Sequence, residues 1–129
     1  MSGYLLDTNV ALLAVTDPAV LSSPTRSAIR TGSNTLSVVV YWEVVLKSLK
    51  GSLSVGDPRS WWLDALEVLL AAPLALRPKH VSALCDLPPI HRDPFDRILV
   101  AQAAAESLTL LTTDRALMRY ASPNVRVIT

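Results

Sequence analysis

Short apolar runs alternate along the chain with segments of helical periodicity, and this alternation constrains the fold more than any other feature. Strands that alternate with helices are typical of a parallel sheet whose strands are joined by helical crossovers. We therefore expect an α/β fold with three α/β/α layers, in which helices flank a central parallel sheet of four to five short strands. The expected strands span residues 3–6, 35–40, 73–77, 108–112 and 124–128.

Helix starts are marked by a capping side chain followed by proline. This pattern occurs at Ser23-Pro24, Asp57-Pro58 and Asp93-Pro94. It favours a helix start because the side-chain oxygen accepts from a free backbone N–H, and proline fits the first helical turn. The expected helices span residues 8–15, 24–31, 41–50, 58–71, 78–86, 94–106 and 114–120.

The length of 129 residues predicts one domain, residues 1–129, and half of the residues are apolar, enough for a core. A net charge of +1 neither indicates nor excludes nucleic acid. Cys85 is the only cysteine, which excludes a disulfide framework and fits a reducing cytoplasm. No signal peptide and no apolar run of membrane-spanning length is visible, so we expect a cytoplasmic protein without membrane contact.

Four acidic residues are expected at one edge of the sheet. Asp7 follows the first strand directly, and Glu43 lies in the first turn after the second strand. Asp96 lies in the first turn of the helix that leads into the fourth strand, and Asp114 follows that strand. In right-handed β–helix–β units, helix N-termini lie at the same edge as strand C-termini. Open α/β sheets bind their ligands at this edge.

Each acid taken alone has a simpler interpretation as a helix cap. Asp93 is an ideal N-cap before Pro94, and Asp96 then favours the helix dipole. Four like charges placed together cost energy, however, unless a cation lies among them. Oxygen ligands suit Mg²⁺ or Mn²⁺, and no histidine or cysteine cluster competes for zinc. Such a site suggests metal-activated attack of water on a phosphodiester.

Basic residues next to the acids are candidates for holding a phosphate backbone. Lys47 lies one turn from Glu43, Arg97 is adjacent to Asp96, and Arg115 is adjacent to Asp114. For Lys47 and Arg115, a solvated helix surface remains an equally good interpretation. Arg97 is the preferred candidate.

Four segments of the chain resemble the four motif regions of PIN-domain ribonucleases and, more narrowly, of VapC-type toxins of type II toxin–antitoxin systems. They are, in order, "YLLDTNV", "YWEVVLK" with a following "LKGSL", "HRDPFDRILVAQA" and "LTLLTTD". The resemblance extends from about Tyr4 to Ile128, and "HRDPFDR" followed by "LVAQA" is its most specific part. It implies a PIN-like fold and an endoribonuclease that uses Mg²⁺ or Mn²⁺.

The resemblance also implies roles for individual residues. Asp7 and Asp96 would be the principal metal ligands, and Glu43 and Asp114 would complete the catalytic pocket, partly through water. Asp93 fits the helix cap better than the metal site. The residues expected to contact the substrate are Thr8, Asn9, Arg97 and Thr112.

Partners follow from the same resemblance. The family implies a homodimer with paired active sites, inhibited by a cognate VapB-type antitoxin whose C-terminal segment wraps the toxin. Operator DNA would be bound only through the antitoxin. The expected substrate is transfer RNA or ribosomal RNA, whose cleavage inhibits translation.

Two features depart from the family pattern. Many relatives carry a serine a few residues before the motif glutamate, where this chain has Val38–Val40, with Ser37 further back. Trp61 is followed by Trp62 where one tryptophan is expected. We expect one of them in the core, while the other is either exposed at an antitoxin or dimer surface or buried as well.

Two other interpretations remain open. A catalytically degenerate PIN domain would bind only a partner or RNA, although the intact set of four acids favours an enzyme. A receiver or other phosphoryl-transfer domain should carry an acceptor aspartate after its third strand, and "PLALRPKH" contains none.

Overall fold

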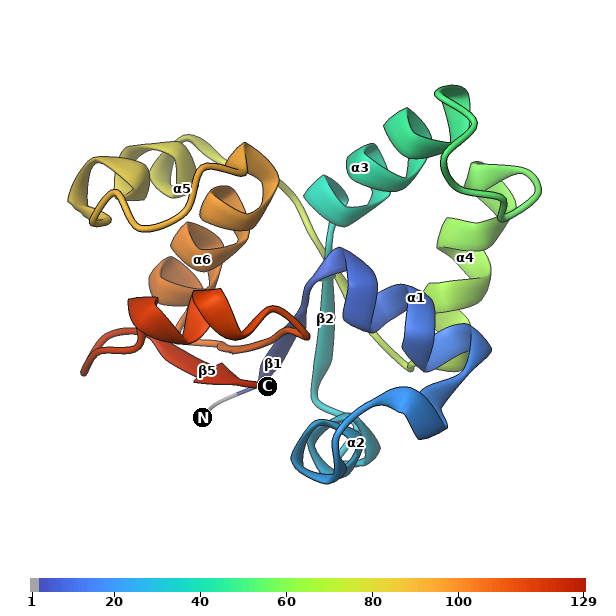
Figure 1. The fold of residues 1–129 in the computed structure, drawn as a ribbon, viewed down its shortest axis with the longest axis horizontal. Helices are drawn as coiled ribbons and strands as arrows, with labels where there is room; N and C mark the ends of the chain where they lie inside the picture. The colour runs from blue at the N-terminus through green and yellow to red at the C-terminus, as the bar shows by residue number, and fades with distance from the viewer. Residues whose placement is uncertain (1–2) are drawn as a thin grey trace.

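The computed structural model describes residues 3–129 and shows an α/β fold (Figure 1). Five strands form one sheet in the order β3-β2-β1-β4-β5, and all neighbouring strands are parallel. The expected parallel sheet flanked by helices is confirmed, while residues 1 and 2 of the expected domain lie outside the described chain. The strands are β1 (Tyr4–Leu6), β2 (Asn34–Ser37), β3 (Ala72–Leu74), β4 (Thr109–Leu111) and β5 (Arg126–Ile128).

Helices connect the strands and cover both sides of the sheet. Figure 1 shows α5 and α6 on one side of β1 and β2, and α1, α3 and α4 on the other. The helices are α1 (Thr8–Thr16), α2 (Ser23–Arg30), α3 (Val38–Leu49), α4 (Pro58–Val68), α5 (Pro78–Ala83) and α6 (Pro94–Glu106), with 3₁₀ helices η1 (Pro18–Val20), η2 (Leu84–Asp86) and η3 (Arg115–Tyr120).

The inner strands form the centre of the hydrophobic core. Leu5, Leu6, Leu36, Leu110 and Leu111 have no exposed surface, because helices cover both faces of β1, β2 and β4. Burial of each such side chain contributes roughly 1.5–3 kcal/mol. The ends of these strands, and the residues that follow them directly, are therefore held in fixed positions.

β1 lies where the order of the strands reverses. The chain passes outward from β1 through β2 to β3, and it then returns to the other side of β1 with β4 and β5. The carboxyl ends of all five strands meet at one edge, and α1, α3 and η3, which follow β1, β2 and β4, begin there. Ligand sites of open α/β sheets lie at this edge, next to the point of reversal.

The prediction that the second strand spans residues 35–40 is wrong. β2 ends at Ser37, and residues Val38–Val40 form the first turn of α3. The reason is a cap, since Oγ of Ser37 accepts a hydrogen bond from the backbone N–H of Val39 at 3.0 Å. Glu43 consequently lies in the second turn of α3 and not in the first turn after the strand.

Other elements also differ from the prediction. The N-cap of α2 is Ser22 and not Ser23, since Oγ of Ser22 accepts from the backbone N–H of Thr25. α4 ends at Val68 instead of Ala71, because Leu70 adopts a left-handed φ of 49° and turns the chain into β3. The third strand is shorter than predicted. The segment 78–86 divides into α5 and η2, and the last predicted helix is the 3₁₀ helix η3.

The two adjacent tryptophans have different surroundings. Trp61 is buried in the core, as expected for one of the pair. Trp62 is partly buried and stacks on Tyr41, with ring centroids 5.0 Å apart and an interplanar angle of 6°. In the described part of the chain, no helix has the length and apolar character needed to cross a membrane.

Candidate active site

Asp7 follows β1 directly and is the N-cap of α1. Its Oδ1 accepts a hydrogen bond from the backbone N–H of Val10 at 2.9 Å, and its side chain is buried. Burial raises the pKa of Asp7 to about 6, against the hydrogen bonds from Thr112 and Val10, and the charges of Glu43 and Asp114 add to the rise. An ionised Asp7 is therefore destabilised until a positive charge compensates it.

Asp96 lies in the first turn of α6, where Asp93 places it. Oδ1 of Asp93 accepts hydrogen bonds from the backbone N–H groups of Phe95 at 2.9 Å and Asp96 at 3.4 Å. Burial raises the pKa of Asp96 to about 7, and the charges of Asp93 and Asp7 add to this effect. Asp93 is thus the cap of the helix, and Asp96 faces the other acids.

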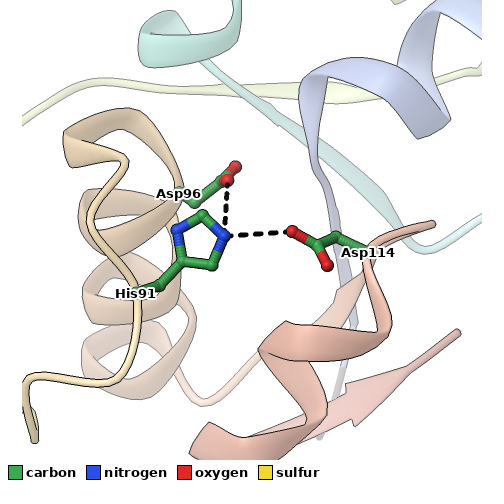
Figure 2. A group of neighbouring side chains, drawn as sticks. All are labelled: His91, Asp96 and Asp114. Atoms are coloured by element: carbon green, nitrogen blue, oxygen red, sulfur yellow. Dashed lines mark hydrogen bonds and ion pairs between the residues drawn. The ribbon is translucent and has the colours of Figure 1, made fainter.

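His91 lies between Asp96 and Asp114 (Figure 2). Its Nε2 is 3.1 Å from Oδ2 of Asp114 and 3.8 Å from Oδ2 of Asp96. The backbone N–H of Asp93 donates to Nδ1 of His91 at 3.1 Å, so the neutral imidazole carries its proton on Nε2 and donates it to Asp114. His91 therefore acts as a hydrogen-bond donor that orients Asp114.

Asp114 follows β4 and caps η3. Its Oδ1 accepts a hydrogen bond from the backbone N–H of Ala116 at 2.9 Å, while Oδ2 faces His91. The backbone N–H of Asp114 donates to Oγ1 of Thr112 at 3.0 Å. One oxygen of the carboxylate thus fixes the start of η3, and the other is directed into the site.

Glu43 reaches the site from α3. The hydroxyl of Thr8 donates a short hydrogen bond to Oε1 of Glu43, and Nζ of Lys47 lies 3.0 Å from Oε2. The glutamate is buried, whereas the Lys47 side chain is about half exposed. Thr8 and Lys47 therefore hold both carboxylate oxygens of Glu43 at the boundary between the site and solvent.

The structure divides the four predicted acids into two groups. Within residues 3–129, one ligand atom from each of His91, Asp96 and Asp114 lies within 4.8 Å of the other two. Asp7 and Glu43 lie outside this close set, but their negative charges raise the pKa of Asp96. All four acids belong to one electrostatic site at the carboxyl edge of the sheet, in which His91 joins Asp96 to Asp114.

Arg97, the preferred residue for holding a phosphate, is engaged elsewhere. Its Nη1 donates to the carbonyl of Pro88 at 3.0 Å and to the hydroxyl of Tyr120 at 3.1 Å. The same hydroxyl accepts from the backbone N–H of His91 at 2.9 Å. The guanidinium therefore ties η3 to the loop that carries His91, and these contacts support a structural role.

The other residues expected to contact substrate also make internal hydrogen bonds. Thr8 donates to Glu43, and Thr112 bonds to the side chain of Asp7. Nδ2 of Asn9 donates to Oγ1 of Thr113 at 2.7 Å, and Asn9 is exposed at the rim of the site. Asn9 is thus the one of the three that solvent can reach freely.

His91 is the residue that sequence reasoning missed. A lone histidine shows no metal-ligand spacing, and so it gave no signal by itself. The available signal was its place two residues before the cap Asp93, where its ring can accept the N–H of that residue. This local geometry predicts a histidine held against the start of α6.

The donor atoms at the site fit a hard divalent cation. The side chains that converge are carboxylates from the N-termini of α1 and α6, the second turn of α3 and the loop after β4. Because Nδ1 of His91 accepts from the backbone N–H of Asp93, Nε2 faces the acids with its proton and not with its lone pair. Two of the carboxylates have raised pKa values, which means that their ionised forms are destabilised by burial and by the neighbouring acids. A cation among them would offset that destabilisation. Oxygen donors of this kind suit Mg²⁺ or Mn²⁺.

The sequence matches one protein-family model, and the matched residues include the candidate site. The model described as the PIN domain matches residues 4–123, which include all four acids and His91. A comparison with curated protein sequences gave no match.

Solved structures of toxin–antitoxin complexes contain chains of similar fold. VapBC2 from Rickettsia felis, bound to a DNA fragment from its promoter, has a chain with a TM-score of 0.68 at 19% identity, covering 99% of this chain and 98% of that chain. DNA-bound VapBC from Salmonella typhimurium gives 0.69 at 15% identity, covering 99% and 98%. VapBC-5 from Mycobacterium tuberculosis gives 0.61 at 22% identity, covering 98% and 97%. At these identities the likeness shows the fold.

Proposed function

Because the chain belongs to the PIN-domain family, we propose that it is a Mg²⁺- or Mn²⁺-dependent endoribonuclease, the toxin component of a VapBC-type toxin–antitoxin pair. One observation carries the enzymatic part of the proposal. Asp7, Glu43, Asp96 and Asp114 converge from separate elements, and the pKa values of Asp7 and Asp96 are raised in the absence of a compensating charge. A site that served only as a set of helix caps would not need this convergence.

Asp7 and Asp96 would hold the metal ion, while Glu43 and Asp114 would contact it directly or through water. When bound, the ion supplies Lewis acidity for activating water and neutralising a phosphate. His91 keeps Asp114 in place by donating from Nε2, and Thr8 with Lys47 keeps Glu43 in place. These hydrogen bonds fix the carboxylates before substrate arrives, which is how a preorganised site lowers a reaction barrier.

The substrate that we propose is transfer RNA or ribosomal RNA, cut in the cytoplasm so that translation stops. A cognate VapB-type antitoxin would neutralise the enzyme, and operator DNA would be bound only through that antitoxin. The solved complexes of similar fold, two of which contain DNA, support this assignment. We also propose a homodimer and a toxin–antitoxin hetero-oligomer. Asn9, the exposed member of the predicted substrate-binding set, is the best placed to contact RNA.

Mapping RNA ends in cells tests the function. We expect brief expression of the wild-type chain to arrest growth and to create new 5′ ends at one or a few positions in a transfer or ribosomal RNA. D96N, which keeps the side-chain volume and removes the charge, should produce neither effect at equal protein level. Growth arrest by D96N equal to that by the wild type would refute the assigned chemistry.

A further inference from the structure

α3 carries a stripe of exposed apolar side chains. The spacing of these residues along the chain puts them on one face of the helix, and they are Val38, Trp42, Leu46 and Leu49. Trp42 is 53% exposed and Leu49 is 79% exposed. The helix otherwise packs against α1, α4 and α6. The stripe is therefore the side of α3 that the fold leaves uncovered.

Trp42 is held in place within the stripe. Phe95, near the start of α6, packs against it edge to face, with ring centroids 5.0 Å apart and an interplanar angle of 73°. This contact fixes the indole while more than half of its surface stays open to solvent. A large aromatic side chain that is fixed and surrounded by aliphatic neighbours is typical of the centre of a protein–protein interface. The stripe thus has the composition of a contact with another protein.

The two ends of α3 differ in charge. The acids of the candidate site lie at the carboxyl edge of the sheet, where α3 begins. Lys47 and Lys50 lie at the other end of the helix. Lys47 pairs with Glu43 of its own helix, whereas Lys50 forms no salt bridge within residues 3–129. The stripe therefore runs from a negative end to a positive end with an uncompensated cation.

A second copy of the chain complements this distribution if its α3 runs antiparallel. A two-fold axis pairs the same surface of both copies, so the symmetry allows either a parallel or an antiparallel pair of helices. In the parallel pair Lys50 would face Lys50, and like charges would be brought together. In the antiparallel pair the positive end of each helix lies against the negative end of the other.

The antiparallel pair also brings Lys50 to the correct flank. Lys50 and Glu43 are seven residues apart, which is nearly two full turns, so both lie on the same flank of α3. The two-fold axis keeps corresponding flanks of the two helices on one side of the dimer. Because the stripe is centred between Trp42 and Leu46, Lys50 of the partner subunit lies level with Val38, where the acids gather.

We propose that a second copy of the chain covers this stripe with its α3 antiparallel, and that each acidic site receives a cation, Lys50 of the partner subunit. The inference rests on the proposed homodimeric ribonuclease and adds to it the contact surface and a residue supplied by the other copy. Within residues 3–129, none of Asp7, Asp96 and Asp114 pairs with a lysine or arginine. The partner supplies that charge, which reduces the repulsion between the acids and an anionic substrate.

Another apolar surface of the molecule does not suit a second copy. A cavity of about 480 Å³ is lined mainly by apolar side chains of α1, η1 and α2, and its charged residues are Arg26 and Arg30. Pairing this surface with itself would bring the arginines of both copies together without an acidic group to compensate them. The α3 stripe, with opposite charges at its two ends, is the surface that complements itself.

Light scattering tests the contact without a cleavage assay. We expect the wild-type chain to be a dimer, and W42A to raise the dimer Kd at least about 30-fold, as loss of a residue central to an interface does. L46E should be monomeric, because the contact would bury two uncompensated charges. Leu63, exposed on α4, gives the matched controls L63A and L63E, which should dimerise as the wild type does. A monomeric wild type, or W42A and L46E that dimerise as the Leu63 variants do, would overturn the inference.

Mixing two defective variants tests whether Lys50 acts on the site of the other copy. K50A should cleave RNA more slowly than the wild type, and D96N should not cleave it. In a heterodimer of the two, one site combines Asp96 with Lys50 of the partner subunit, whereas the other site lacks both. Refolding the variants together should therefore restore activity to about a quarter of the wild-type value at equal total protein, since half of the dimers carry one intact site.

Two results would show that Lys50 does not act across the dimer. If it acted within its own chain, no site of the heterodimer would be intact, and the mixture would only show the mean activity of the two variants. If K50A cleaved RNA as fast as the wild type, Lys50 would have no part in the site. A chain that dimerises through Trp42 and Leu46 but cleaves no RNA would leave the contact standing and would refute the proposed enzyme.

Discussion

Asp93 and Asp96 lie one turn apart, and the structure gives them different tasks. The side chain of Asp93 accepts hydrogen bonds from the backbone N–H groups that begin α6, whereas Asp96 faces the other acids. The sequence predicts this division, because a cap followed by proline fixes where the helix begins and which side chains its first turn carries. His91 could not be predicted in the same way, since its role depends on a hydrogen bond to Asp114 from a distant element.

Replacing Asp93, the N-cap of α6, should lower the stability of the protein more than its activity. We expect D93A to lower the free energy of unfolding by about 1 kcal/mol, as a lost N-cap does, and to reduce RNA cleavage only in part. D93N is the matched control, because asparagine caps helices as well as aspartate does. Denaturant unfolding with a cleavage assay on each variant measures both effects. Complete loss of metal binding in D93A would mean that Asp93 is itself a ligand.

Replacing His91 should act through Asp114. In H91A the Oδ2 oxygen of Asp114 loses its donor, and we expect Mn²⁺ affinity to fall by about 10- to 100-fold, as when a residue supporting a ligand is removed. H91Q should recover part of the affinity, because its amide nitrogen can occupy the position of Nε2. Calorimetric titration with Mn²⁺ measures the change. Equal affinities in H91A and wild type would remove His91 from the site.

The start of α3 shows where sequence reasoning about elements fails. A run of three valines has high strand propensity, yet Val39 and Val40 are buried in a helix. Tertiary packing against the sheet outweighs that propensity, and the cap at Ser37 ends β2 before the run begins. β1 and β4 can be located from their apolar runs, because inner parallel strands are covered on both faces and show as continuous hydrophobic segments.

The serine caps of α3 and α2 allow the loss of a cap near the candidate site to be compared with the loss of a cap away from it. S37A removes the cap of α3, which carries Glu43, and S22A removes the cap of α2, which carries none of the acids. Each should lower the free energy of unfolding by about 1 kcal/mol. We expect RNA cleavage to fall in S37A and to stay constant in S22A, under conditions where both variants are folded. Equal activity of the two would show that the position of Glu43 does not depend on this cap.

At the scale of the whole molecule, a parallel sheet gathers the acids and leaves their repulsion uncompensated. The order of the strands places the ends of β1, β2 and β4 side by side. The residues that follow these strands therefore also lie close together. The alternation of strands and helices was enough to predict the shared edge. It could not predict that, within residues 3–129, the close set would consist of Asp96, Asp114 and His91, because side-chain directions depend on contacts between distant elements.

The uncompensated acids should make the metal-free protein less stable as pH rises. The pKa values of Asp7 and Asp96 are raised from 3.8 to about 6 and about 7. The folded state therefore binds more protons than the unfolded state between about pH 4 and 7, and the free energy of unfolding falls across that window. In EDTA at pH 8, D96N should be more stable than wild type by roughly 1–3 kcal/mol.

The difference between D96N and wild type should shrink as the pH falls towards 4, because Asp96 is then protonated in the folded state and partly protonated in the unfolded state. Mg²⁺ or Mn²⁺ at pH 8 should raise the stability of wild type more than that of D96N, since binding to the folded state alone stabilises it. Denaturant unfolding at both pH values, with and without metal, measures these differences. A wild-type protein that is as stable as D96N at pH 8 without metal would contradict the raised pKa values.

Cleavage of RNA by the purified protein tests the central claim most directly. With Mg²⁺ or Mn²⁺, the wild-type chain should cut RNA at discrete positions. EDTA, D7N and D96N should each reduce cleavage to the level of a blank without protein, while all three proteins remain folded. Cleavage by D7N and D96N at the wild-type rate, or wild-type cleavage unaffected by EDTA, would contradict a metal-dependent site built on these two aspartates.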